Sequence, residues 1–103
     1  MTPLFIPLKR EYFEAFKAGT KTEEFRPYGR RWNERTCPVG RAVTLSLGYG
    51  KSHRMTGVVT GFVASTTPSD TAAWVACYGP GQRMVACIRI RLDPPSTGAK
   101  VCS

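Results

Sequence analysis

The sequence predicts one small α+β domain, mainly β, that folds as a closed or nearly closed barrel of about five to six strands with two helices. Short segments in which apolar and polar residues alternate, separated by glycines, are typical of strands with one buried face. One N-terminal stretch and one short stretch near residues 69–78 have helical features instead. The length of 103 residues suits one hydrophobic core and leaves little room for a second.

The first part of the chain is expected to form a strand, a helix and a second strand. Thr2–Leu8 is apolar and contains two prolines, which favours an edge strand. Lys9–Ala18 carries its large apolar side chains at helical spacing, and Gly19 follows as the left-handed stop. Thr20–Arg26 is rich in threonine and ends before a proline, so we expect a strand there.

Three more strands are expected to pair with Thr20–Arg26 in one curved sheet. They are Arg41–Leu47, Arg54–Ala64 and Met84–Leu92, each with period-2 alternation over most of its length. Two glycines within the second of these strands predict a bulge or a barrel corner: Gly57 and Gly61. The domain should therefore span residues 1–92, and residues 93–103 should form a disordered tail.

The apolar segments and the cysteines predict a cytoplasmic monomer without a metal or other cofactor. No apolar run approaches the ~20 residues that span a bilayer, and the N-terminal apolar segment is too short for a signal peptide. The chain has a single histidine and four cysteines without a C-x-x-C pair, which argues against a zinc site. We expect reduced thiols, with Cys77 and Cys87 as small buried hydrophobic residues.

The formal net charge is +8, and most of it is concentrated in one stretch. Between Arg26 and Arg54 there are seven basic residues against one acid, Glu34, so this stretch carries +6. Aromatic residues are interleaved with the cations there: Tyr28, Trp32 and Tyr49. Such a surface favours an anionic ligand, whereas the plainer interpretation is a cationic face without a partner.

The segment from helix to strand resembles the signature of the ASCH family. In that family a helix ends at a glycine, and the following strand carries the pattern G-x-K-x-x-E-x-R, which here is Gly19, Lys21, Glu24 and Arg26. The segments 38–45 and 85–92 resemble the family's Gly-led strand and its closing strand, so the similarity covers roughly residues 4–92. The resemblance implies a PUA-like β-barrel with a cleft beside the strand that carries this motif. Many members of the family are proposed RNA binders.

One branch of the ASCH family consists of small amidohydrolases that deacetylate cytidine acetylated on its exocyclic amine. The catalytic set of that branch is a lysine, a threonine three residues later and a distant glutamate. Lys21 matches the lysine, but Glu24 occupies the threonine position, and no glutamate follows residue 34. This departure counts against the same catalytic triad in this chain.

We expect RNA or a nucleotide-like small molecule to bind in a basic cleft bordered by Lys21, Glu24, Arg26, Arg31, Trp32 and Lys51. On an ideal strand Lys21 points away from Glu24 and Arg26, so the three converge only if a bulge or twist intervenes. The alternative is an exposed ion pair of little energetic value.

Two further segments have competing interpretations. Trp32, with Tyr28 and the arginines between them, suits a platform on which bases stack, but Trp32 equally suits a cover over one end of the barrel. The segment 48–54 combines two glycines with the basic residues Lys51, His53 and Arg54, as a phosphate-binding loop would. It lacks the residue spacing of such a loop, however. A hairpin turn is the better interpretation, with Lys51 at the edge of the cleft.

Three classes of function remain open at this stage. The first is a binding module for RNA or a nucleotide, the second a small hydrolase acting on modified cytidine through Lys21 and Glu24, and the third an interaction domain whose basic face meets an acidic protein. The missing threonine and distant glutamate favour binding over catalysis.

Overall fold

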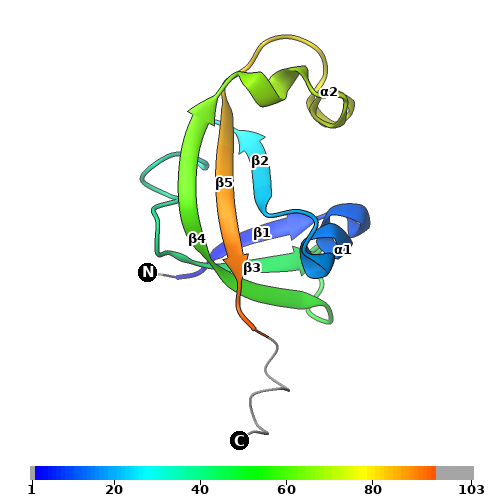
Figure 1. Ribbon diagram of the computed structural model, residues 1–103, viewed down its shortest axis with the longest axis vertical. Coiled ribbons are helices and arrows are strands. Elements are labelled where there is room, and N and C mark those ends of the chain that lie inside the picture. Colours follow the sequence, from blue (N-terminus) through cyan, green and yellow to red (C-terminus); the bar gives the residue numbers. More distant parts are fainter. Residues whose placement is uncertain (1, 95–103) are drawn as a thin grey trace, which may run out of the picture.

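The computed structural model describes residues 2–94 and shows one five-stranded sheet that curls into an open half-barrel (Figure 1). The strand order is β1-β3-β4-β5-β2, with β1 parallel to β3 and every other neighbouring pair antiparallel. The strands are β1 Leu4–Leu8, β2 Glu23–Pro27, β3 Ala42–Leu47, β4 Arg54–Ser65 and β5 Val85–Leu92. The predicted class, α+β and mainly β, is confirmed, as is the pairing of the four later strands in one sheet.

The sheet does not close into a barrel through a hydrogen-bonded ladder. In residues 2–94 the strands β1 and β2 are the two edges of the sheet, as the prolines of β1 predicted for that strand. A side chain joins these edges instead: Nη2 of Arg26 on β2 donates to the backbone carbonyl oxygen of Pro7 on β1 at 2.6 Å. The expected closed or nearly closed barrel is therefore a half-barrel whose edges are connected by one guanidinium.

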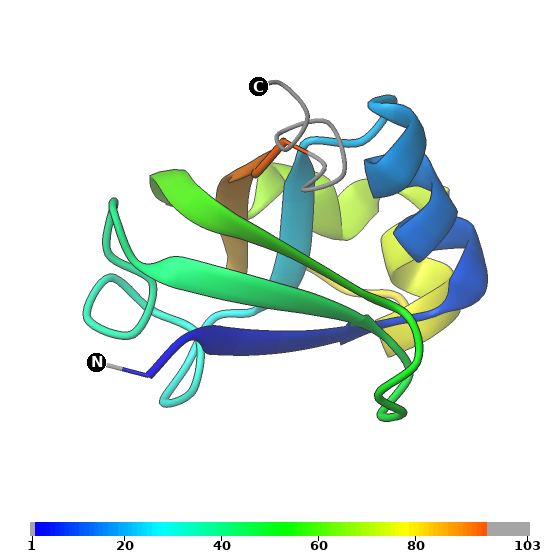
Figure 2. The same ribbon diagram turned by 90° about the horizontal axis from the view of Figure 1, so that it is seen from below.

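The helix α1 (Arg10–Ala18) packs against β1 and β3 and covers one end of the curled sheet (Figures 1 and 2). It buries Phe13 and Phe16 in the main core, next to side chains from β1 and β3. The helix ends where predicted, because Gly19 adopts a left-handed conformation with φ 84°.

The second strand begins three residues later than predicted, at Glu23 instead of Thr20. The backbone N–H groups of Thr20 and Lys21 both donate to the carbonyl oxygen of Ala15, at 3.0 and 3.1 Å. They complete the end of α1 and are not available to a sheet ladder. Lys21 consequently lies before β2, on a segment whose side chains do not have to alternate.

The short helix expected near residues 69–78 is present in two pieces. A 3₁₀ turn, Thr67–Asp70, precedes α2 (Ala72–Tyr78), and Thr71 between them is extended and caps α2 by accepting a hydrogen bond from the Trp74 backbone N–H. Trp74 packs on Val85 and Cys87 of β5, on the face of the sheet opposite to the main core. This second small core holds α2 beside β2 and β5.

The main core is formed by the concave side of the sheet and the residues that close its ends. Trp32 and Cys37, from the long loop between β2 and β3, are both buried in it. The predicted irregularity in β4 is confirmed, because the register between β4 and β5 shifts between Val59 and Gly61. Among the residues that the structure describes, no helix is long and apolar enough to cross a bilayer. The predicted disordered tail lies outside the described residues, apart from positions 93 and 94.

Gly57 allows β4 and β5 to approach closely. A Cβ atom added at this position would lie 2.5 Å from the backbone oxygen of Arg91, which is a severe overlap with backbone atoms. We expect Gly57→Ala to lower the free energy of unfolding by about 2 kcal/mol or more, measured by urea denaturation. Gly61→Ala is the matched control on the same strand, since its Cβ would meet the nearest atom at an ordinary 3.6 Å. Equal losses in the two variants would contradict this assignment.

Candidate functional site

A cavity of about 500 Å³ opens between β2, α2 and the junction of β1 with α1. Its volume falls in the range of pockets that hold small molecules and nucleotides. The end of β1 contributes Pro7 and Leu8 to its lining, and the start of α1 contributes Lys9 and Tyr12. The segment that contains β2 contributes Lys21, Glu24, Phe25 and Arg26. Helix α2 and its cap contribute the remaining residues: Thr71, Ala73, Trp74, Cys77 and Tyr78. Helix α2, which the sequence predicted without assigning it a role, therefore forms one wall of the site.

Among the described residues, the carboxylate of Glu24 is the one acidic group that lines the cavity. Glu24 is the inward-facing residue of β2 and is 7% exposed. One oxygen accepts from Nε of Arg26 at 2.7 Å, and the other lies 3.6 Å from Nζ of Lys21. A carboxylate this deeply buried is stable only when it is paired, and both of its oxygens face a cation here.

The predicted convergence of Lys21, Glu24 and Arg26 is therefore present, although by a different route from a strand bulge. Lys21 precedes β2, so the alternation of the strand does not turn its side chain away. Its ammonium also lies 5.4 to 5.5 Å from the ring centres of Tyr12, Phe16 and Phe25. Cation–π contacts and an ion pair together fix the position of this ammonium group in the cavity.

Aromatic side chains form much of the remaining wall. Trp74 and Tyr78 stack at 4.2 Å between ring centres on α2, and Tyr12 reaches the cavity from α1. Burial raises the pKa of Tyr78 and the pKa of Tyr12 above the usual value of a phenol. Both hydroxyls therefore stay protonated at neutral pH, where they can donate hydrogen bonds. The indole N–H of Trp74 is buried and has no hydrogen-bond partner in the described part of the chain.

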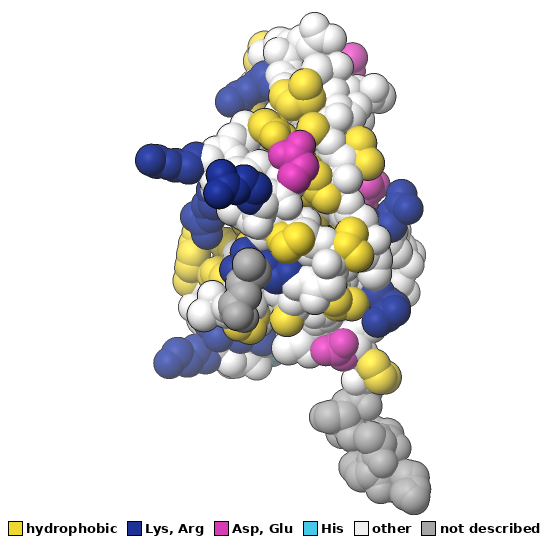
Figure 3. Space-filling view, turned by 90° about the vertical axis from the view of Figure 1, so that its left-hand side faces the viewer, with side chains coloured by type: hydrophobic (Ala, Val, Ile, Leu, Met, Phe, Trp, Pro, Cys, Tyr) yellow, Lys and Arg dark blue, Asp and Glu magenta, His cyan; other side chains and the backbone are white. Residues whose placement is uncertain are grey.

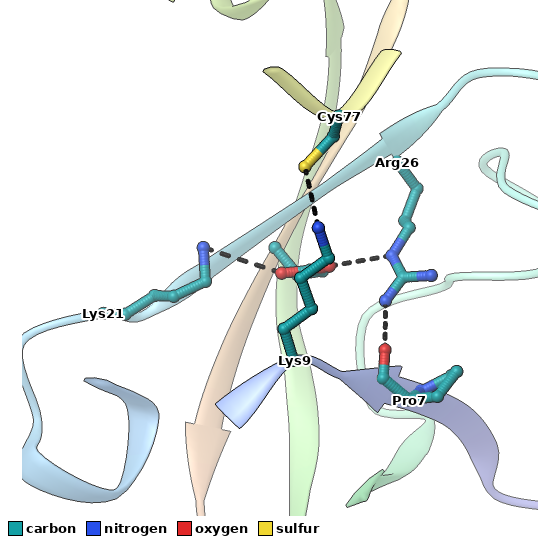
Figure 4. A network of polar contacts seen from close by, with 6 residues as sticks. Pro7, Lys9, Lys21, Arg26 and Cys77 are labelled. Carbon is teal, nitrogen blue, oxygen red and sulfur yellow. Dashed lines mark hydrogen bonds and ion pairs between the residues drawn. The ribbon is translucent and has the colours of Figure 1, made fainter. Parts of the chain in front are cut away.

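Cys77 contradicts the expectation of a buried thiol. Its side chain is exposed, lines the cavity and lies 3.9 Å from Nζ of Lys9 (Figure 4). The prediction failed because α2 turns this residue toward the cavity instead of toward the sheet. Cys87 is buried as expected, and burial raises the pKa of its thiol, which keeps it protonated and unreactive. Cys37, for which the sequence predicted no environment, is buried in the main core.

The charges of the cavity are unbalanced. Lys9, Lys21 and Arg26 bring three positive charges to its lining, and Glu24 brings the one carboxylate. Two of the cations are paired with Glu24, whereas Lys9 has no acidic partner within the described residues. The cavity therefore combines one acceptor of hydrogen bonds with an excess of positive charge, which suits a ligand that has both amino groups and an anionic group.

Three of the six predicted site residues are not part of this cavity. Trp32 is 7% exposed in the main core, with the guanidinium carbons of Arg26 and Arg31 at 5.1 and 5.2 Å from its ring centre. It takes the covering position that the sequence left as an alternative, with its ring buried in the core and outside the lining of the cavity. Arg31 is exposed beside it, and Lys51 is exposed on the hairpin between β3 and β4.

Sequence reasoning missed the contributions of the two helices to the site. Lys9 and Tyr12 fall within the predicted helix Lys9–Ala18, but the sequence assigned neither a role in the site. Trp74, Cys77 and Tyr78 follow the spacing i, i+3, i+4, which places them on one helical face. That spacing was a usable signal for a common surface, but the sequence does not show that this surface faces β2.

No protein-family model matches the chain, and no curated protein matches it either. The function of the site must therefore be argued from its own geometry.

Arg26 is expected to contribute more to stability than any exposed ion pair of the chain. Arg26→Met leaves the buried Glu24 carboxylate without its nearest cation and should lower the free energy of unfolding by about 3 kcal/mol, measured by urea denaturation. The double variant with Glu24→Gln should lose less than the sum of the single losses, because no unpaired charge remains. Arg10→Met, which removes the exposed pair with Glu14, should change stability by less than about 0.5 kcal/mol. Additive losses would show that Arg26 and Glu24 act independently.

Proposed function

We propose that this protein is an ASCH-like domain of PUA-like architecture that binds a nucleotide, free or within RNA, in the cavity beside β2. The observation that carries the proposal is the buried Glu24 carboxylate, held between Lys21 and Arg26 in a cavity with aromatic walls. The half-barrel and the grouping of three motif residues, Lys21, Glu24 and Arg26, in one cavity both support the resemblance to the ASCH family.

The cavity offers the kinds of group that recognise a nucleobase. A carboxylate accepts hydrogen bonds from exocyclic amino groups, as in contacts between glutamate and the amino group of cytosine. Each oxygen of Glu24 keeps a free lone pair after its contact with a cation. The rings of Tyr12 and Tyr78 supply aromatic surface for contact with a planar base. Their phenol hydroxyls provide donors for base carbonyl oxygens.

The same cavity favours a ligand that carries a phosphate. Its three cations exceed its one carboxylate, and Lys9 is the cation without an acidic partner. Lys9 lies at the start of α1, where the helix dipole adds to the attraction for an anion. A nucleoside 5′-monophosphate therefore fits the charge of the site better than the uncharged nucleoside does.

Titration with the four nucleosides and their 5′-monophosphates tests this proposal. We expect a monophosphate to bind more tightly than its nucleoside and to shift the amide resonances of residues around the cavity. Glu24→Gln should weaken binding about tenfold or more, because hydrogen bonds to a charged group are worth about 1.5–3 kcal/mol. Glu14→Gln, on the exposed side of α1, is the matched control and should bind as the unchanged protein does. Absence of binding, or shifts remote from the cavity, would refute the proposal.

Cys77 supplies an independent readout of the same site. A bound nucleotide should slow alkylation of Cys77 by iodoacetamide, measured by peptide mass spectrometry, since this thiol lines the cavity. Cys37 and Cys87 are buried and should resist alkylation with or without ligand, which reports that the protein remains folded.

The hydrolase alternative has less support from this geometry. Nζ of Lys21 lies 3.6 Å from the Glu24 carboxylate, and Glu24 itself stands at the position where the amidohydrolases have their threonine nucleophile. We therefore expect negligible release of cytidine from N4-acetylcytidine, followed by chromatography, and little gain in Glu24→Thr. Turnover above background that disappears in Lys21→Ala would make the chain an amidohydrolase.

A further inference from the structure

A second aromatic and cationic surface lies at the hairpin between β3 and β4. Tyr49, at the tip, is 78% exposed, and its ring centre is 6.0 Å from that of Phe5 on β1. The guanidinium carbon of Arg54 lies 5.3 Å from the same Phe5 ring. We call Phe5, Tyr49 and Arg54 the hairpin platform. Phe5 is half-buried, so Tyr49 is the exposed ring of the platform. An exposed ring beside a guanidinium is typical of surfaces on which single-stranded nucleic acids stack their bases.

Two of the three platform residues, Tyr49 and Arg54, lie in a part of the sequence without acidic residues. From Arg35 to Ser69 the sequence contains Arg and Lys but neither Asp nor Glu. Lys51 stands next to the platform in the hairpin and is exposed, and neither it nor Arg54 forms an ion pair with any residue in the range 2–94. Unpaired cations beside an exposed ring suit a chain of bases joined by phosphates.

The hairpin platform adjoins the cavity. The backbone N–H of Gly48, at the start of the hairpin, donates to the carbonyl oxygen of Leu8, which lines the cavity. Phe5 and Pro7 point to the same face of β1, two residues apart, and Pro7 also lines the cavity. Figures 1 and 2 both place this hairpin at the end of the sheet where α1 begins. The platform and the cavity are therefore connected through the end of β1.

The other exposed aromatic candidates are less suited to a nucleic acid. Tyr28 is 38% exposed, but its hydroxyl donates to the carboxylate of Glu34, which places a negative charge beside the ring. On the face shown in Figure 3, Lys and Arg side chains are scattered and separated by hydrophobic and neutral surface. Tyr49 is 78% exposed, and within residues 2–94 its hydroxyl forms no hydrogen bond with an acid.

We propose that the hairpin platform is a second nucleotide subsite: it stacks the base adjacent to the nucleotide in the cavity, while Lys51 contacts the intervening backbone phosphates. This inference rests on the proposed function and extends it from a single nucleotide to a single-stranded nucleic acid of at least two nucleotides. Stacking on the platform is independent of base identity, so the subsite adds affinity, and the cavity supplies any selectivity.

The test compares mononucleotides with short strands on the full chain. The probes are the four nucleoside 5′-monophosphates and the four matching ribonucleotide homotrimers, titrated by fluorescence or calorimetry. A trimer should bind more tightly than its monophosphate. Tyr49→Ala should weaken trimer binding about tenfold and leave monophosphate binding unchanged. Tyr49→Phe should retain trimer binding, since the ring remains. Tyr28→Ala, another exposed tyrosine, is the matched control and should alter neither.

Salt dependence separates stacking from phosphate contacts. Lys51→Ala should reduce the slope of log affinity against log salt for the trimer by about 0.7, the share of one phosphate contact on a single strand. Tyr49→Ala should leave that slope nearly unchanged, because a stacking contact releases no counterion.

The possible outcomes distinguish the two proposals. If a monophosphate binds and Glu24→Gln weakens it, but Tyr49→Ala leaves trimer affinity unchanged, the second subsite is refuted and the cavity proposal stands. A trimer affinity that depends on Tyr28 instead of Tyr49 also refutes the subsite. If trimers depend on Tyr49 but monophosphates do not bind and Glu24→Gln has no effect, the proposed function of the cavity fails. If neither probe binds, both proposals fail.

Discussion

The contact of Arg26 with Glu24 and Pro7 is the interaction on which the rest of this structure depends. A half-barrel has two unpaired edge strands, and here the guanidinium of Arg26 connects them through the Pro7 carbonyl oxygen while it neutralises the Glu24 carboxylate. One side chain thus defines the distance between β1 and β2 and allows a charged group to be buried between them. The cavity exists because this connection is a side chain and not a ladder of backbone hydrogen bonds, which would have brought the two strands together.

The same contact determines which chemistry the cavity supports. Glu24 is held between the side chains of Lys21 and Arg26, and the Lys21 ammonium also lies near three aromatic rings. Charged groups that are fixed by several contacts are positioned to recognise a ligand. Tyr12 and Tyr78, whose pKa values are raised mainly by burial, add two phenol hydroxyls that can donate hydrogen bonds at neutral pH. These contacts are the reason for preferring the binding proposal over the hydrolase alternative.

Most elements of the fold were predictable because their signals are local. Helical spacing and a terminal Gly19 predict α1, and period-2 alternation predicts β3 and β5 within one residue of their observed starts. The start of β2 was not predictable in the same way. Thr20 and Lys21 have strand-like sequence, but their N–H groups are used to complete α1, and that competition is settled by the hydrogen bonds of the folded chain. The sequence analysis also expected a more closed barrel than the structure has. The alternation of residues within each strand contains no information on whether the two edge strands of the sheet meet.

The sequence by itself determined the helix–glycine–strand motif, the positive charge and the grouping of Lys21, Glu24 and Arg26 as a candidate site. Only the tertiary structure decided what surrounds that site. Helix α2 brings Trp74 and Cys77 to β2 from about fifty residues further along the chain, and Trp32, equally plausible as a binding residue, is taken into the core. The physical reason is that the burial of a side chain and its contact partners depend on which surfaces come together when the sheet curls. A motif within eight consecutive residues can be recognised in the sequence, whereas a wall formed by distant elements cannot.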